Sequence, residues 1–170
     1  MAALSQVTIR ARAIMVATKL GVFDALIAGA LSAPDAAARC DTSPAATEKL
    51  LSMLVGSGYL RFNDGRYALS STARKWLTTE SPNSLRDKVL FEFVEWNLVE
   101  RLETFVRTGD PVDMHASASP EEWGLYQRAM RALSGLAAPE VVRRTPMPAG
   151  ATTMLDIGGS HGYISVAMCR

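Results

Sequence analysis

Residues 32–69 read SAPDAAARCDTSPAATEKLLSMLVGSGYLRFNDGRYAL, and this stretch contains start signals for two helices and a turn signal for a hairpin. Ser32 followed by Asp35 is a capping box, which opens a short helix. Ser43 as N-cap and Pro44 at the first helical position then begin a second helix. Two helices in this order, followed by a hairpin, predict a winged helix.

The hairpin signal is the dipeptide Asp64-Gly65, which favours a two-residue type I′ turn between antiparallel strands. A turn of that length pairs Phe62 with Tyr67, and on the same face it pairs Leu60 with Leu69. Helix caps, turn chemistry and strand register therefore agree on one structure, which is what a sequence with a unique fold shows.

A winged helix can bind DNA, but the residues at the start of the second helix argue against this. A recognition helix presents Arg, Lys, Asn or Gln to the base edges. This helix instead presents Pro44, Ala45, Ala46 and Glu48, and Lys49 is its only basic residue. The net charge of the chain is +1, which is too small for a general attraction to nucleic acid. A transcription regulator remains an alternative, and no nucleic-acid partner is expected.

The N-terminal segment from Leu4 to about Thr18 has apolar residues at helical spacing and few charges. Such a helix is usually buried, and a second subunit is one way to bury it. A short helix, Val22 to Ile27, follows it. The first 23 residues contain no acid, a composition that can resemble a mitochondrial transit peptide. We favour an amphipathic helix instead.

The segment after the hairpin is predicted to form two helices. The first covers Ser71 to Leu77. The second begins at a capping box formed by Ser84 and Asp87 and runs from Leu85 to about Val106. Its apolar residues recur at spacings of three and four: Leu85, Val89, Phe93, Trp96, Val99, Leu102 and Val106.

A polar loop carrying His115 comes next, and we expect this histidine to be solvated. Ser119, Pro120 and Glu122 form another helix start. The helix that follows carries Trp123, Tyr126, Met130 and Leu133 on one side and ends at Arg144. Residues 145–150 read TPMPAG and are the clearest linker in the chain.

The last motif is Met154-Leu155-Asp156-Ile157-Gly158-Gly159-Ser160-His161-Gly162, an apolar run that ends in an acid and a glycine-rich turn. A strand, a glycine turn and a helix beginning near Tyr163 make the first βα unit of a nucleotide-binding sheet. The dinucleotide fingerprint fails, because Ser160 and Tyr163 occupy its second and third glycine positions. A carboxylate at the strand end suits a ligand with an ammonium group, which favours S-adenosylmethionine.

Composition places the 170 residues among soluble globular chains, with 48% hydrophobic and 21% charged residues. Cys40 and Cys169 are isolated and show no metal-ligand spacing, so no metal site is predicted. Two lone cysteines indicate either a reducing compartment or ordinary packing, and we expect a cytoplasmic protein. No apolar run approaches membrane-spanning length, and no membrane partner is expected.

The order of these parts resembles the class I S-adenosylmethionine-dependent small-molecule O-methyltransferases of plants and bacteria, which act on phenolic and polyketide-type natural products. The resemblance covers Leu4 to Arg170. It implies a mainly helical homodimerisation domain with an embedded winged helix, which also forms a wall of the acceptor pocket. It further implies that Trp123, Tyr126 and Met130 approach the acceptor, although ordinary helix packing explains them equally well.

By the same resemblance, the methionyl and ribose end of the cofactor is lined by Asp156, Gly158, Gly159, Ser160 and Gly162. Ser160 departs from the family pattern, which has a third glycine there. The family's ribose-binding acid and general-base histidine lie beyond Arg170, so no catalytic residue is assigned, and His161 is not given that role.

The expected division is a helical domain over 1–144, a linker over 145–151, and over 152–170 the first βα unit of an incomplete Rossmann-like domain. We expect these residues alone to be dimeric and inactive, with weak or absent cofactor binding. Residues after Ala151 should be poorly ordered or paired with a neighbour, because Met154 to Ile157 is otherwise an exposed apolar edge. A non-catalytic partner of a second methyltransferase chain is an alternative, and methylation of nitrogen or carbon stays open.

Overall fold

The computed structural model describes residues 2–111 and 113–170, and side chains from Gln6 onward. Leu4, one of the predicted apolar positions, lies outside the described side chains. The elements in chain order are α1 (Ala2–Lys19), α2 (Val22–Ala25), α3 (Ala33–Cys40), α4 (Pro44–Gly56), β1 (Leu60–Asn63), β2 (Arg66–Leu69), α5 (Ser71–Leu77), α6 (Arg86–Glu100), α7 (Leu102–Thr108), α8 (Met114–Ser117), α9 (Pro120–Arg144) and α10 (Tyr163–Met168). The predicted mainly helical fold is confirmed.

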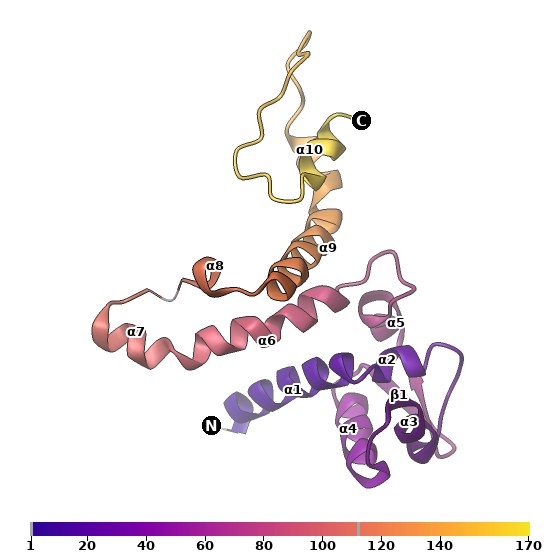
Figure 1. The fold of residues 1–170 in the computed structure, drawn as a ribbon. Coiled ribbons are helices and arrows are strands. Elements are labelled where there is room, and N and C mark those ends of the chain that lie inside the picture. Colours follow the sequence, from indigo (N-terminus) through magenta and orange to yellow (C-terminus); the bar gives the residue numbers. More distant parts are fainter. Residues whose placement is uncertain (1, 112) are drawn as a thin grey trace.

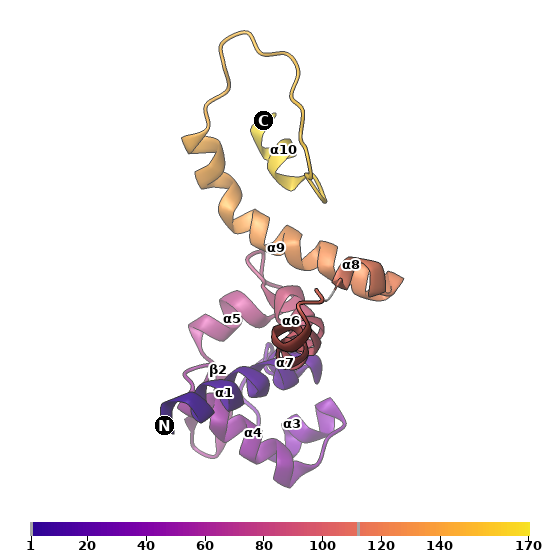
Figure 2. The same cartoon turned by 90° about the vertical axis from the view of Figure 1, so that its left-hand side faces the viewer.

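The molecule is elongated, with a compact lobe at one end and α10 at the other (Figures 1 and 2). The lobe contains α1 to α5 and the hairpin. In Figure 1, α6 runs above α1, and α9 rises from α6 towards α10. Residues 145–162, between α9 and α10, form a long loop that extends away from α9 and then returns to its C-terminal half. Helix α9 thus connects the lobe to the C-terminal turn.

The helices and hairpin predicted for residues 32–69 are all present. The Ser32 hydroxyl accepts a hydrogen bond from the Asp35 N–H at 3.2 Å, and Ser43 is the N-cap of α4. Asp64 and Gly65 have φ angles of 49° and 74°, as a type I′ turn requires. The predicted register, with Phe62 opposite Tyr67 and Leu60 opposite Leu69, is confirmed.

Leu31, which precedes α3, adds a third segment beside the hairpin. Leu31 forms an antiparallel bridge with Tyr67, with N–H to carbonyl distances of 3.0 and 2.7 Å. The bridge attaches the segment before α3 to β2. Tyr67 is buried, and it therefore holds the hairpin, this segment and the core together.

The core of the lobe lies between the helices α1 to α5 and the hairpin. Its largest fully buried apolar side chains are Val22, Phe23, Leu26, Leu51 and Leu54. Val89 packs against them from α6, which attaches the long helix to the lobe. Nonlocal burial of this kind stabilises short helices that are marginal in isolation.

Polar and cationic contacts add to the link between the lobe and α6. Asp24 accepts hydrogen bonds from the Thr79 N–H and hydroxyl at 2.8 and 3.0 Å, and it lies 3.5 Å from the Arg86 Nε. The Arg12 guanidinium lies 4.5 Å from the ring centre of Phe93 and 5.2 Å from that of Trp96. The contacts of Arg86, Phe93 and Trp96 attach the first residue and the second half of α6 to the lobe.

The long helix predicted from Leu85 to Val106 is interrupted, so that prediction was wrong in its extent. Arg101 has φ −90° and ψ 0°, and it separates α6 from α7. The predicted capping box at Ser84 is also absent. Leu85 is the N-cap: its carbonyl accepts from the Val89 N–H at 2.9 Å, and its own N–H donates to the Trp76 carbonyl at 2.7 Å. Ser84 instead accepts from the Arg86 N–H at 3.3 Å.

The strand expected at Met154 to Ile157 is not formed, and the Rossmann-like βα unit is therefore absent from the described residues. The glycine turn and α10 are present, but β1 and β2 make the only sheet in the part of the chain that the structure describes. A parallel strand buried on both faces needs paired neighbours. Without them, Leu155 and Ile157 remain 83% and 88% exposed.

None of the helices described in the structure is long and apolar enough to cross a membrane.

Candidate functional site: helix α9 and the glycine-rich turn

Helix α9 begins at a complete capping box, as its sequence predicts. The Ser119 hydroxyl accepts from the Glu122 N–H at 3.2 Å, and the Glu122 carboxylate accepts from the Ser119 N–H at 2.8 Å. The pKa of Glu122 is lowered, mainly by the hydrogen bond from the Ser119 N–H to its carboxylate. A hydrogen bond from the Ser119 hydroxyl to the same carboxylate lowers the pKa further. The box fixes where the helix starts and hence which of its residues share a face.

Four rings from three helices meet near the start of α9. Trp123 lies 5.5 Å from Tyr126 in an edge-on arrangement, and Tyr126 lies 5.4 Å from Phe91 of α6. His115 of α8 stacks on Trp123 at 5.2 Å, with 19° between the ring planes. Such ring pairs stabilise by about 0.5–1.5 kcal/mol beyond their buried area. The aromatic cluster therefore docks α8 and α6 on α9.

The helix that carries His115, and its contact with Trp123, were not predicted from the sequence. We expected a polar loop, and the segment instead forms the short helix α8, whose N-cap Asp113 accepts from the Ala116 N–H at 3.0 Å. His115 is exposed but packed on one face. The Asp-x-x-Ala capping spacing was the available signal. Val112 lies outside the described residues.

Lys88 of α6 lies beside this cluster, 5.5 Å from the Phe91 ring centre. Partial burial lowers its pKa, but hydrogen bonds to Glu92 and Glu95 outweigh this, and the pKa of Lys88 is raised. The lysine stays protonated at neutral pH, so it cannot serve as a general base there.

The predicted acceptor residues occupy one helix, though they differ in what they contact. Trp123 and Tyr126 belong to the aromatic cluster, and Met130 lies one turn further along α9, half-buried. Tyr126 also packs against Phe91 of α6. The roles of Trp123, Tyr126 and Met130 towards an acceptor remain predictions.

The glycine-rich turn has the backbone geometry that its sequence implies. Gly158 and Gly162 have φ angles of 76° and 70°, which favour glycine. The Asp156 carboxylate lies against Gly159, where a Cβ atom would require this side chain to move. Ser160 has a φ of 52°, so the serine in place of the family's third glycine adopts the left-handed conformation.

Two side-chain contacts attach this turn to α9. The Ser160 hydroxyl donates to the Gln127 Oε1 at 2.8 Å. The Ser134 Oγ lies 3.3 Å from the His161 Nε2. The structure thus places the predicted site residues of the turn, 156–162, against the helix that carries residues 123–130. Neither Gln127 nor Ser134 was predicted, because their role depends on a contact about 30 residues away in sequence.

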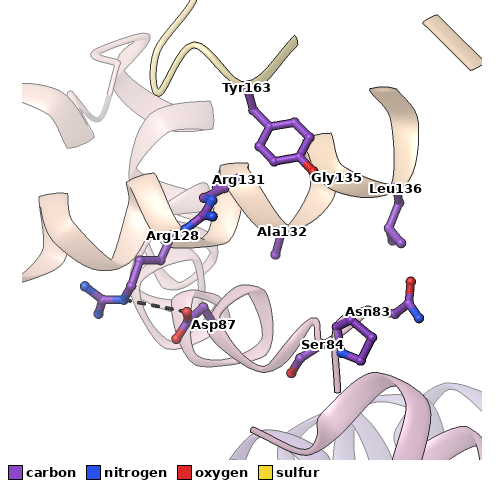
Figure 3. Close-up of a pocket in the computed structure, with 10 residues that line it drawn as sticks. Asn83, Ser84, Asp87, Arg128, Arg131, Ala132, Gly135, Leu136 and Tyr163 are labelled. Atoms are coloured by element: carbon purple, nitrogen blue, oxygen red, sulfur yellow. Dashed lines mark ion pairs between the residues drawn. The ribbon is translucent and has the colours of Figure 1, made fainter. Parts of the chain in front are cut away.

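A cavity of about 290 Å³ lies between α9, the start of α6 and α10 (Figure 3). Asp87 and Arg128 form an ion pair across it at 3.6 Å. Tyr163 closes the far side, and its hydroxyl lies near Gly135 (Figure 3). None of the predicted site residues lines this cavity, so we do not count the cavity as part of the candidate site.

Among the residues described, no group of three or more His, Cys, Asp or Glu side chains is placed to hold a metal ion.

Comparison with known proteins identifies the N-terminal lobe. Residues 3–79 match the O-methyltransferase dimerisation domain, and this range covers α1 to α5 with the hairpin. The N-terminal lobe is thus similar to an O-methyltransferase dimerisation domain, and residues 80–170 lie outside that match.

The chain is similar to several solved structures over almost all of its residues. Human N-acetylserotonin methyltransferase, solved in complex with SAM, shares the fold at a TM-score of 0.83 and 22% identity, covering 93% of this chain and 51% of that protein. The mitomycin 7-O-methyltransferase MmcR gives a TM-score of 0.81 at 27% identity, covering 97% of this chain and 52% of that one. The chain therefore spans about half the length of these enzymes.

A human relative described as a probable bifunctional dTTP/UTP pyrophosphatase/methyltransferase protein is 27% identical over 174 residues. The match covers 94% of this chain and 28% of that protein.

Proposed function

We propose that these residues form the dimerisation and acceptor-binding half of an S-adenosylmethionine-dependent O-methyltransferase that acts on an aromatic or polyketide-like small molecule. The helical domain is 1–144, the linker 145–151, and residues 152–170 begin the cofactor-binding domain. One observation carries the proposal. The turn predicted to meet the cofactor is attached to the same helix that presents Trp123, Tyr126 and Met130.

The glycine-rich turn fits an S-adenosylmethionine cradle in its backbone. Positive φ angles at Gly158 and Gly162 expose the main chain to close approach by a ligand. The Asp156 side chain is solvent-accessible and accepts a hydrogen bond from the Ser165 hydroxyl, and its carboxylate can attract an ammonium group. Bound there, the cofactor supplies an electrophilic methyl group. This turn supplies only part of its binding site.

The dimer partner we propose is a second copy of the chain. Exposed apolar side chains occur on the N-terminal half of α1, near the end of α6 and on α7. We call this the apolar end face; its residues are Val7, Ile9, Val99, Leu102, Phe105 and Val106. Exposed apolar patches of this kind mark interaction sites. The face is continuous with α1, which belongs to the dimerisation domain.

The exposed residues of α4 do not favour the alternative of a DNA-binding regulator. Ala45, Ala46 and Glu48 are exposed at the start of that helix, where base-reading side chains would be needed.

Calorimetric titration with S-adenosylhomocysteine tests whether these residues bind the cofactor, and the mass in solution tests whether they dimerise. We expect a dimer that gives no measurable heat and transfers no methyl group, because Met154 to Ile157 lacks the neighbouring strands of a cofactor-binding sheet. Micromolar binding would mean that the cradle is completed between chains. A monomer would contradict the proposed assembly.

The acceptor role is tested in a chimera that continues after Arg170 with the C-terminal half of MmcR, its relative at 27% identity. We expect S-adenosylmethionine-dependent methylation of phenolic acceptors. Met130→Ala in the chimera should raise the acceptor KM about tenfold, the scale of lost apolar pocket contacts. S-adenosylhomocysteine affinity should stay unchanged. Equal losses for cofactor and acceptor would assign Met130 to helix packing, and a folded, cofactor-binding chimera without methylation would refute the acceptor class.

A further inference from the structure

We propose that Gln127 and Ser134 are positioning residues, which fix the glycine-rich turn in register with the acceptor-facing residues of α9. The inference rests on the proposed function, since it assigns the turn to the cofactor and Trp123 to Met130 to the acceptor. Its evidence is the geometry of two contacts, one through Ser160 and one through His161.

The first contact explains why a serine occupies a glycine position. Ser160 has a φ of 52°, a conformation that side chains other than glycine rarely adopt. Its hydroxyl donates to the Gln127 Oε1 at 2.8 Å. Glycine would relax the backbone but could not make this hydrogen bond. The serine therefore adopts an unfavourable backbone conformation, and in return its hydroxyl fixes the distance between the turn and α9.

The second contact defines the tautomer of His161. The Tyr163 N–H donates to the His161 Nδ1 at 3.1 Å, so Nδ1 carries no proton and the neutral ring is protonated on Nε2. The Nε2–H then donates to the Ser134 Oγ at 3.3 Å. Because Tyr163 is the first residue of α10, its N–H lacks a partner within that helix. His161 thus caps α10 and holds it against α9.

The spacing of the two contacts sets the register. Gln127 and Ser134 are seven residues apart, about two helical turns, and therefore share a face of α9. Met130 lies between them along the helix. Any rotation or sliding of α9 moves the turn and the acceptor-facing residues together. A site held on one helix keeps its parts in place better than one built from independent loops.

Amide hydrogen exchange of the 170-residue chain tests the two contacts without cofactor or acceptor. Gln127→Ala and Ser134→Ala should each accelerate exchange over residues 158–168 about fivefold to tenfold, the scale of one lost hydrogen bond. Exchange over 32–69 should not change. Gln127→Glu keeps an acceptor oxygen and should restore the slow exchange. Glu121→Gln, an exposed change on the same helix, is the matched control.

Nitrogen NMR of His161 supplies an independent readout. We expect the neutral ring to carry its proton on Nε2, and Ser134→Ala to shift that resonance. A proton on Nδ1, or exchange over 158–168 that is unchanged in both alanine variants, would overturn the proposal. If both readouts agree with it and the chimera still methylates nothing, the contacts stand and the proposed function fails.

Discussion

Replacing Phe23 with alanine is expected to lower the free energy of unfolding by about 3–5 kcal/mol, the range for deletion of a buried aromatic side chain. Phe23 is 1% exposed and lies in the core beside Tyr59, with ring centres 6.4 Å apart. Its helix, α2, is only 4 residues long and depends on this burial. Since small domains are stable by about 5–15 kcal/mol, the loss removes a large share of the total.

Urea unfolding followed by circular dichroism measures this effect as a lower midpoint with an unchanged slope. Phe62→Ala is the matched control, because Phe62 is 50% exposed on the hairpin. We expect it to cost less than about 1.5 kcal/mol, mostly its ring contact with Tyr67. Equal losses in the two variants would contradict the position of the core.

The double substitution Leu102→Glu and Val106→Glu is expected to raise the dimer dissociation constant at least about 100-fold, because each subunit would have to bury two unpaired carboxylates. The two side chains are 57% and 73% exposed in the single chain. The substitutions should therefore leave the melting temperature of the separated subunit nearly unchanged.

Sedimentation over a range of concentrations measures the dissociation constant. Met147→Glu, an exposed apolar-to-acid change in the linker, serves as the control and should leave the dimer intact. A double variant that remains as tightly dimeric as the original chain would show that the apolar end face is not the subunit interface.

Local signals in the sequence determined most of the N-terminal lobe. The Asp64-Gly65 turn, the Ser43-Pro44 helix start and the cap formed by Ser32 and Asp35 each involve residues within four positions of one another. Their chemistry is complete in the local chain, so the hairpin register and the helix starts followed directly. The same holds for the positive φ angles of the glycine-rich turn.

Other features depended on contacts between distant residues, and only the tertiary structure decided them. Arg101 interrupts a helix whose apolar pattern continues without a break, and the Leu85 N–H is bound by Trp76, which displaces the predicted cap. His115 packs on Trp123, which no local pattern specifies. The strand at Met154 to Ile157 shows the same dependence in reverse, because its pattern is present and its neighbours are not.

The candidate site divides in the same way. The sequence predicted which residue types line it: the acid and glycines of the turn, and the aromatic and Met residues of α9. The tertiary structure decided that Gln127 and Ser134 join these two groups, through contacts to Ser160 and His161. The physical reason is the separation of the interacting residues along the sequence. Backbone conformation follows from neighbouring residues, whereas a hydrogen bond between segments about 30 residues apart exists only once the chain has folded.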